Sequence, residues 1–252
     1  ATIQVGTCGH KRMSDLPSNP NDVEEPVTAA VFRRGMRSLC FFLLLMALIM
    51  FVPAGIGWTK GWVFLLVFMI YTAVACVYLW HKNPAIFAAR SKLQKGIKRW
   101  DKVLMACLFI SLLAVFPVAG LDNGRFHWSS MPMWLVVLGY VLFSAGFVLS
   151  VWAEAVNKFA EPGVRIQTER GHKVVDTGPY AIVRHPMYLS AFVLFFGTAL
   201  ALGSFWALIP AALVALVLIV RTALEDRTLQ NELTGYREYA GRVHYRLIPG
   251  IW

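Results

Sequence analysis

Long apolar stretches alternate with short polar segments over most of the chain, from about residue 39 to residue 220. Stretches of roughly 20 apolar residues are long enough to cross a hydrocarbon core about 30 Å thick as helices. The pattern therefore predicts six spans joined by loops. They run over Leu39–Ile56, Trp62–Leu79, Val103–Ala119, Trp134–Ala155, Tyr188–Leu202 and Phe205–Val220.

The last two spans form a predicted helical hairpin that folds at Gly203-Ser204. The fifth span is the shortest, so it either crosses the membrane or re-enters on the same side. The chain is thus predicted to be an all-α, polytopic transmembrane helical bundle. A polar loop before the hairpin and a helix after it are predicted to lie outside the membrane.

Polar segments divide the chain into three parts. Residues 1–35 are polar and contain several prolines, which is typical of a flexible tail. Residues 36–156 hold the first four spans. Residues 157–252 hold the polar loop, the hairpin and the C-terminal helix, and we expect the chemistry of the protein there.

Composition agrees with a membrane protein. The chain is 58% hydrophobic and only 15% charged, which excludes an ordinary soluble domain. None of its four cysteines forms a CxxC pair, so no metal site is predicted. The span centres hold no ionisable side chains, and no internal repeat is visible, which argues against an ion pump or secondary transporter.

The distribution of Lys and Arg predicts the orientation in the membrane, because short basic loops stay on the cytoplasmic side. Basic residues crowd the loops after the second and fourth spans, whereas the turns at 58–61, 121–132 and 203–204 contain only Lys60 and Arg125. Both termini and the active site are therefore predicted to be cytoplasmic. The net charge of +10 then follows from topology and attraction to membrane lipid, not from nucleic-acid binding.

The segment 82–102 is the most basic of these loops and contains a single acidic residue, Asp101. Its cations recur at helical spacing, at Lys92, Lys95, Arg99 and Lys102. This spacing suits an amphipathic helix on the lipid headgroups, and a solvated basic loop fits as well.

The polar loop after the fourth span carries the densest set of chemically useful side chains. It includes His172 and a Gly178-Pro179 turn, and it ends in Arg184-His185. Pro186 follows at the start of the fifth span, where a proline loses no needed hydrogen bond. Arg184 and His185 are thereby predicted to lie at a helix N-terminus.

The sixth span is predicted to continue as a helix beyond the membrane. Arg221, Glu225, Glu232, Tyr236 and Tyr239 then follow at spacings that place them on one face. This face is expected to form the wall opposite the His185 loop. Alternatively, Arg221 and Glu225 form only a surface ion pair worth under about 1 kcal/mol.

Taken in order, these motifs resemble the isoprenylcysteine carboxyl methyltransferase family and the related phospholipid methyltransferases. The resemblance covers the chain from about Asn157 to the C-terminus. It rests on Gly178-Pro179-Tyr180, on Arg184-His185-Pro186-Met187-Tyr188, on Arg221 and Glu225-Asp226, on Tyr236, Tyr239, Val243 and Ile248-Pro249, and on His172.

The resemblance implies a membrane methyltransferase that uses S-adenosylmethionine. Glu225 would pair with the cofactor's ammonium, while Arg184 and Arg221 would serve carboxylate or acceptor charge. The cofactor-binding residues implied are His172, Tyr180, His185, Tyr188, Glu225, Tyr236 and Tyr239, and the catalytic residues implied are Arg184, His185, Arg221 and Glu225.

Methyl transfer needs two reactants held in line. A thiol or amine acceptor would also need a base, for which His172 or Glu225 could serve, whereas a carboxylate acceptor would need none.

Three departures from the family pattern leave the acceptor open. The usual paired glutamates are Glu225-Asp226 here, Leu233-Thr234-Gly235 replaces a Phe-Gly, and Ser190 stands where glycine is common. A pocket between the hairpin and its neighbours should open to lipid, which favours a lipophilic or lipidated partner. A prenylcysteine carboxylate, a lipid amine and a thiol all fit.

Two other functions are compatible with the sequence. Membrane sterol and steroid reductases share the Arg-His-Pro-x-Tyr element and a similar C-terminal pattern, here Tyr236 to Pro249, and use NADPH. A non-enzymatic membrane scaffold or transporter would use the polar loop to bind a partner.

Overall fold

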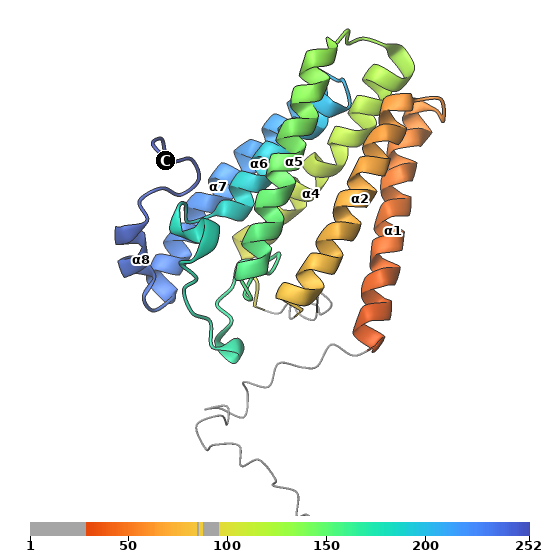
Figure 1. Cartoon of the computed structure of the whole chain (residues 1–252). Helices are drawn as coiled ribbons and strands as arrows, with labels where there is room; N and C mark the ends of the chain where they lie inside the picture. The colour runs from red at the N-terminus through yellow and green to blue at the C-terminus, as the bar shows by residue number, and fades with distance from the viewer. Residues whose placement is uncertain (1–28, 85, 88–95) are drawn as a thin grey trace, which may run out of the picture.

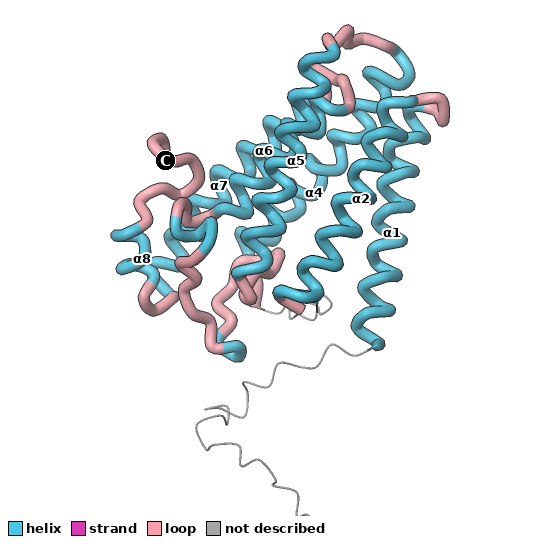
Figure 2. Tube along the Cα trace, in the orientation of Figure 1, coloured by secondary structure: helices cyan, strands magenta, loops and turns pink. Residues whose placement is uncertain are grey.

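The computed structural model describes residues 29–84, 86–87 and 96–252, and throughout these ranges the chain forms helices and loops without a strand (Figures 1 and 2). The long helices pack side by side as a bundle, and the short C-terminal helix lies at one end of it. The helices are α1 Ala29–Ala54, α2 Thr59–Lys82, α4 Arg99–Ala119, α5 Met133–Val156, α6 Pro186–Ala201, α7 Leu208–Glu232 and α8 Tyr236–Arg242, with a π-helix at Gly120–Phe126 and 3-10 turns at Thr168–Arg170 and Gly178–Ala181.

Five helices of the described ranges are long and apolar enough to span a membrane: α1, α2, α4, α5 and α7. The predicted fifth span corresponds to α6, which is apolar but has only 16 residues. At about 1.5 Å per residue it reaches roughly 24 Å, which is short of a hydrocarbon core of about 30 Å. The prediction of a polytopic helical bundle is confirmed.

Two predicted boundaries differ from the helix bounds. Helix α1 begins at Ala29, which lies within the predicted tail of residues 1–35. Helix α7 stops at Glu232, and Gly235, with φ of +83°, turns the chain before α8 begins. Because this left-handed conformation suits glycine, the replacement of Phe-Gly by Leu233-Thr234-Gly235 still allows a turn.

Residues 85 and 88–95 of the predicted amphipathic segment 82–102, which include Lys92 and Lys95, lie outside the described residues, whereas Arg99 begins α4. Of the predicted tail, residues 1–28 lie outside them as well.

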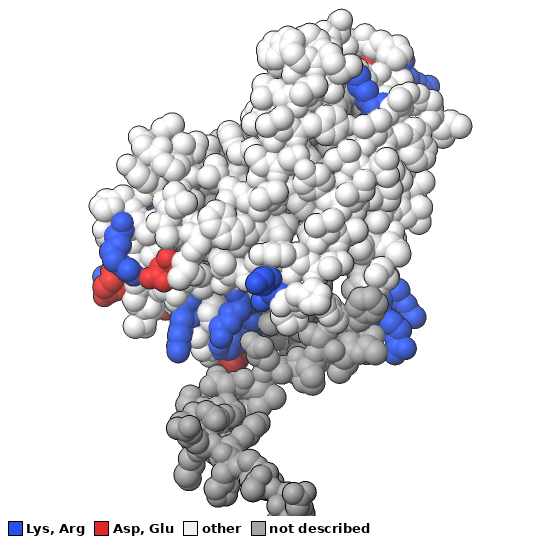
Figure 3. Space-filling view, in the orientation of Figure 1, with Lys and Arg blue, Asp and Glu red and all other residues white. Residues whose placement is uncertain are grey.

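The charged residues fit a membrane-spanning bundle. Figure 3 shows Lys, Arg, Asp and Glu gathered at the two ends of the viewed face, chiefly at the end that carries α8, with a broad uncharged band between them. Many large apolar side chains of the long helices are exposed, including Phe41, Val74, Ile110 and Val141. Such exposure is costly in water and expected in lipid.

The turns at 58–61, 121–132 and 203–204, which the charge pattern predicts on one side of the membrane, lie together in the structure. The Trp58 indole donates to Asn123 Oδ1 at 3.1 Å, and the Asn123 amide donates to the carbonyl of Gly203 at 3.2 Å. Fully buried Asp122 accepts hydrogen bonds from the Ser129 N–H and the Ser204 hydroxyl. These bonds tie the π-helix to the α6–α7 turn. That the opposite end is cytoplasmic stays a prediction.

Helix α6 is held against α5 by three glycines. A Cβ on Gly146 would lie 2.6 Å from the backbone nitrogen of Leu194, and a Cβ on Gly139 or Gly197 would also overlap the facing backbone. Small residues let helices approach closely in membranes, where dispersion contacts drive association. The close contact places the start of α6 next to the loop that follows α5.

The α5–α6 contact gives a stability prediction. Gly197→Ala should lower the free energy of unfolding by about 1–3 kcal/mol, because the new methyl group overlaps the backbone at Phe143. Gly241→Ala is the matched control, since nothing lies within 4 Å of its Cβ position. Thermal unfolding in detergent measures both. Equal melting temperatures would show that the close contact contributes nothing.

Candidate functional site

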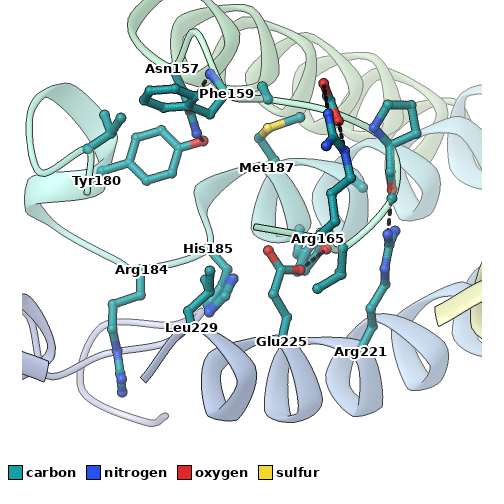
Figure 4. A pocket seen from close by; sticks show the side chains of 18 of the residues that line it. Asn157, Phe159, Arg165, Tyr180, Arg184, His185, Met187, Arg221, Glu225 and Leu229 are labelled. Atoms are coloured by element: carbon teal, nitrogen blue, oxygen red, sulfur yellow. Dashed lines mark hydrogen bonds and ion pairs between the residues drawn. The ribbon is translucent and has the colours of Figure 1, made fainter. Parts of the chain in front are cut away.

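A cavity of about 360 Å³ opens at the end of the bundle that carries α8. The loop between α5 and α6 covers it, and α4, α5, α6, α7 and α8 supply the rest of its walls (Figure 4). All nine site residues expected from the sequence line this one cavity: His172, Tyr180, Arg184, His185, Tyr188, Arg221, Glu225, Tyr236 and Tyr239.

The first turn of α6 reaches across to α7. Pro186 occupies the first helical position, so His185 becomes the N-cap residue, and its ring stacks on that of Tyr188 at a centroid distance of 5.6 Å. The Tyr188 hydroxyl donates a hydrogen bond to the Glu225 carboxylate. The N-cap residue of α6, a residue of its first turn and one residue of α7 thus form a continuous surface of two rings and a carboxylate.

The C-terminal segment fixes this turn from outside. The backbone N–H groups of Arg184 and His185 donate to the carbonyls of Tyr245 and Arg246, each at 2.9 Å. The helix start therefore finds acceptors for its N–H groups in a segment about 60 residues away along the chain.

Asp226 is a centre of polar contacts behind the cavity. Its fully buried carboxylate accepts two hydrogen bonds from Arg184, at 2.8 and 3.0 Å. It also accepts from Arg246 Nε and from the Tyr236 hydroxyl, each at 3.0 Å, and lies 3.5 Å from His185 Nε2. In Figure 4 the Arg184 side chain accordingly points away from Glu225. The charge of Arg184 serves to hold the site together.

Arg221 does not pair with Glu225, so the alternative of a simple surface ion pair is wrong. Its guanidinium binds Asp101 of α4, with Nε–Oδ1 at 2.7 Å and Nη2–Oδ2 at 3.1 Å, and also donates to the carbonyl of Pro162. The guanidinium lies 5.3 Å from the ring centroid of Tyr188. Arg221 is buried, and its charge is balanced by the equally buried Asp101.

The two C-terminal tyrosines support the loop. Tyr236 and Tyr239 pack edge to face at 5.4 Å, and the Tyr239 hydroxyl donates to the Tyr180 carbonyl at 2.7 Å. Burial, together with nearby acidic groups, raises the pKa of both tyrosines, so they are neutral donors. The Asn157 amide donates to the Tyr180 hydroxyl at 2.9 Å, which anchors the turn on its other side.

The surroundings of His172 favour its neutral form. Its ring packs on Phe159 at 4.6 Å, and its Nδ1 accepts the Gln167 N–H at 3.3 Å. Burial lowers the pKa of His172, and the neighbouring Arg170 lowers it further.

Sequence reasoning missed two acidic residues as parts of the site: Asp101 and Asp226. Asp101 is the only acidic residue of the basic segment 82–102, and Asp226 directly follows Glu225. These positions indicated only weakly that the two carboxylates take part in the site. Ser190 is the third departure from the family pattern. Its hydroxyl is satisfied within its own helix, where it donates a hydrogen bond to the Met187 carbonyl at 2.7 Å.

The cavity has two chemical ends. Glu225, Arg221, His185 and Tyr236 line its polar end, whereas side chains from the bundle helices line an apolar end. The latter are Leu108, Ala191, Leu194, Phe195 and Leu218. Within the described part of the chain no three His, Cys, Asp or Glu side chains are grouped to hold a metal ion. The arrangement suits a ligand with a cationic part and an apolar neighbour.

Comparison with known proteins identifies the central segment. Residues 134–234 match the family described as phospholipid methyltransferase. The matched segment runs from α5 through the covering loop and α6 to the end of α7, and it contains seven of the nine cavity residues named above. No curated protein matches the chain. The match supports a membrane methyltransferase, and the resemblance inferred from the motifs is confirmed for this segment.

Removal of the Asp226 charge should strongly destabilise the fold. Asp226→Asn leaves Arg184 buried without a full counter-charge, which typically costs about 3–5 kcal/mol of unfolding free energy. Asp176→Asn is the matched control, because its pair with Arg242 is exposed and worth at most about 1 kcal/mol. Denaturation of both variants in detergent checks this; similar small losses would contradict a structural role for Asp226.

His172 should make stability depend on pH. Above the ordinary histidine pKa of 6.5 both the folded and the unfolded chain hold His172 neutral. As the pH falls through that value, the unfolded chain takes up the proton more readily than the folded chain, whose His172 pKa is lowered, so stability is lost. His172→Gln should lose less melting temperature than wild type between about pH 7.5 and about pH 5.5. Equal losses of melting temperature in wild type and His172→Gln would contradict a lowered pKa of His172 in the folded chain.

Proposed function

We propose that this chain, with its phospholipid methyltransferase segment at residues 134–234, transfers the methyl group of S-adenosylmethionine to a lipophilic acceptor in the membrane. The observation that carries the proposal is the polar end of the cavity. There, the Glu225 carboxylate lies beside the stacked rings of His185 and Tyr188. A carboxylate and aromatic surfaces in one small cavity are suited to a cationic ligand.

The residues present fit this cofactor. A cavity of about 360 Å³ is within the usual range for a small-molecule site. Glu225 would take the cofactor's ammonium, and the rings of His185, Tyr188 and Tyr236 would surround its apolar and sulfonium parts. Tyr180, His172 and Tyr239 would form the covering wall. Bound there, the cofactor would supply an electrophilic methyl group.

The roles of the two arginines differ in this proposal. Arg221 lies one helical turn from Glu225 and lines the same cavity while paired with Asp101, so from that fixed position it would serve the charge of a carboxylate or of the acceptor. Arg184 would act through Asp226, by keeping His185 and Tyr236 in place. Both bear on alignment, which is the main protein contribution to an in-line transfer.

The apolar end of the cavity supports a lipophilic acceptor. Leu108, Leu194 and Leu218 come from α4, α6 and α7, so this end reaches between bundle helices that are apolar enough to lie in lipid. A prenylcysteine carboxylate, a lipid amine and a lipophilic thiol could each place a tail there. For an amine or thiol, neutral His172 would be the candidate base, because a base must be unprotonated to accept a proton.

Cofactor binding tests the proposal directly. Purified protein should bind S-adenosylhomocysteine and not NADPH in calorimetry. Glu225→Gln should weaken that binding about tenfold or more, since a hydrogen bond to a charged group is worth about 1.5–3 kcal/mol. Glu232→Gln is the matched control on the same helix, because Glu232 is exposed and pairs with Lys98. It should change the affinity less than about twofold.

Three results separate the competing functions. Tight NADPH binding would favour a membrane reductase. Binding of neither nucleotide, together with full cellular activity of Glu225→Gln, would favour a scaffold or transporter. Transfer of a labelled methyl group to a lipid or prenylcysteine fraction of a membrane extract would establish the reaction and identify the acceptor class.

A further inference from the structure

Arg221 and Glu225 lie four residues apart on α7, which is the spacing at which opposite charges pair on a helix. Nevertheless, no hydrogen bond or ion pair joins these two described residues. In Figure 4 both side chains rise from α7 into the site, and the dashed bond of Arg221 leads away from Glu225. Arg221 therefore binds another partner in place of Glu225.

Asp101 is that partner. It lies in the first turn of α4, and its carboxylate is fully buried. Both of its oxygens receive the Arg221 guanidinium in a forked arrangement, at 2.7 and 3.1 Å. Such a two-point contact is geometrically favoured between a guanidinium and a carboxylate.

The covering loop completes the arrangement. Asp101 Oδ2 also accepts the Val164 N–H at 2.7 Å, and the Pro162 carbonyl accepts from Arg221. The Val164 carbonyl in turn accepts the Lys98 N–H at 3.2 Å. Three hydrogen bonds of Arg221 are thus directed to α4 and the loop, on the side away from Glu225.

The consequence for Glu225 is electrostatic. Its hydrogen bond comes from the Tyr188 hydroxyl, which brings no positive charge, and within the described residues no ion pair joins Glu225 to a Lys, Arg or His side chain. A buried guanidinium without an anion is costly. If the Asp101 charge were absent, Glu225 would be the nearest anion on the same helix, and Arg221 would occupy the position that a ligand's ammonium needs.

We propose that Asp101 is a positioning residue that holds the Arg221 guanidinium away from Glu225, and so leaves the Glu225 carboxylate free to bind a cationic ligand group. The inference rests on the proposed function, since S-adenosylmethionine supplies that group as its ammonium. Asp101 itself does not line the cavity and acts through Arg221.

A double-mutant cycle on S-adenosylhomocysteine binding tests the inference. Calorimetry compares wild type, Asp101→Asn, Arg221→Met and the double variant. Asp101→Asn should weaken binding about tenfold or more in the presence of Arg221. In the Arg221→Met background the same substitution should change the affinity less than about threefold, because no guanidinium remains to compete for Glu225. Any contribution of Arg221 itself cancels in this comparison.

The outcomes are distinguishable. Equal weakening in both backgrounds would overturn the inference, because Asp101 would then act only by anchoring the loop at Val164. Unchanged affinity of Asp101→Asn would overturn it as well. Failure of the wild type to bind S-adenosylhomocysteine would reject the proposed function, and with it this role of Asp101.

A second variant guards against misfolding of Asp101→Asn. Asp101→Glu keeps the negative charge and moves it by one methylene, so the guanidinium stays paired and the fold is retained. It should weaken binding less than Asp101→Asn where that variant folds, and by less than about threefold in absolute terms. A loss as large as that expected for Asn would contradict the role of the charge.

Discussion

Charges buried at the edge of a membrane need partners, and in this protein two aspartates provide them. Asp226 holds Arg184 and Arg246, and Asp101 holds Arg221, with both carboxylates fully buried. Isolated buried charges would be too costly to retain. These pairs therefore allow the site at the end of the bundle to hold Arg184 and Arg221 close to the Glu225 carboxylate.

The pairs also join parts of the chain that are far apart in sequence. Asp226 connects α7 to the turn before α6 and to the C-terminal segment, while Asp101 connects the start of α4 to α7 and to the covering loop. Each pair fixes a different wall of the same cavity. A rigid cavity favours alignment of two reactants, which is what a methyl transfer demands of a protein.

The bundle supplies the frame for these contacts. The glycines Gly139, Gly146 and Gly197 bring α5 and α6 into backbone contact, and at the far end Asp122 ties the π-helix to the α6–α7 turn. Because α6 is short and held at both ends, its first turn meets α7 at the depth of Glu225. The position of the site thus follows from the packing of helices that contribute no charge to it.

Periodicity and composition alone determined the helical bundle and the approximate positions of the long spans, because burial in lipid requires long apolar helices whatever their neighbours are. The motifs likewise indicated His185, Tyr188 and Glu225 as neighbours. Only the tertiary structure decided that Arg221 turns to Asp101 and not to Glu225, that Arg184 faces Asp226, and that the chain breaks at Gly235 before α8. The physical reason is that a buried charge chooses the partner with the best geometry among all those the fold brings near, and sequence spacing shows only the candidates on its own helix.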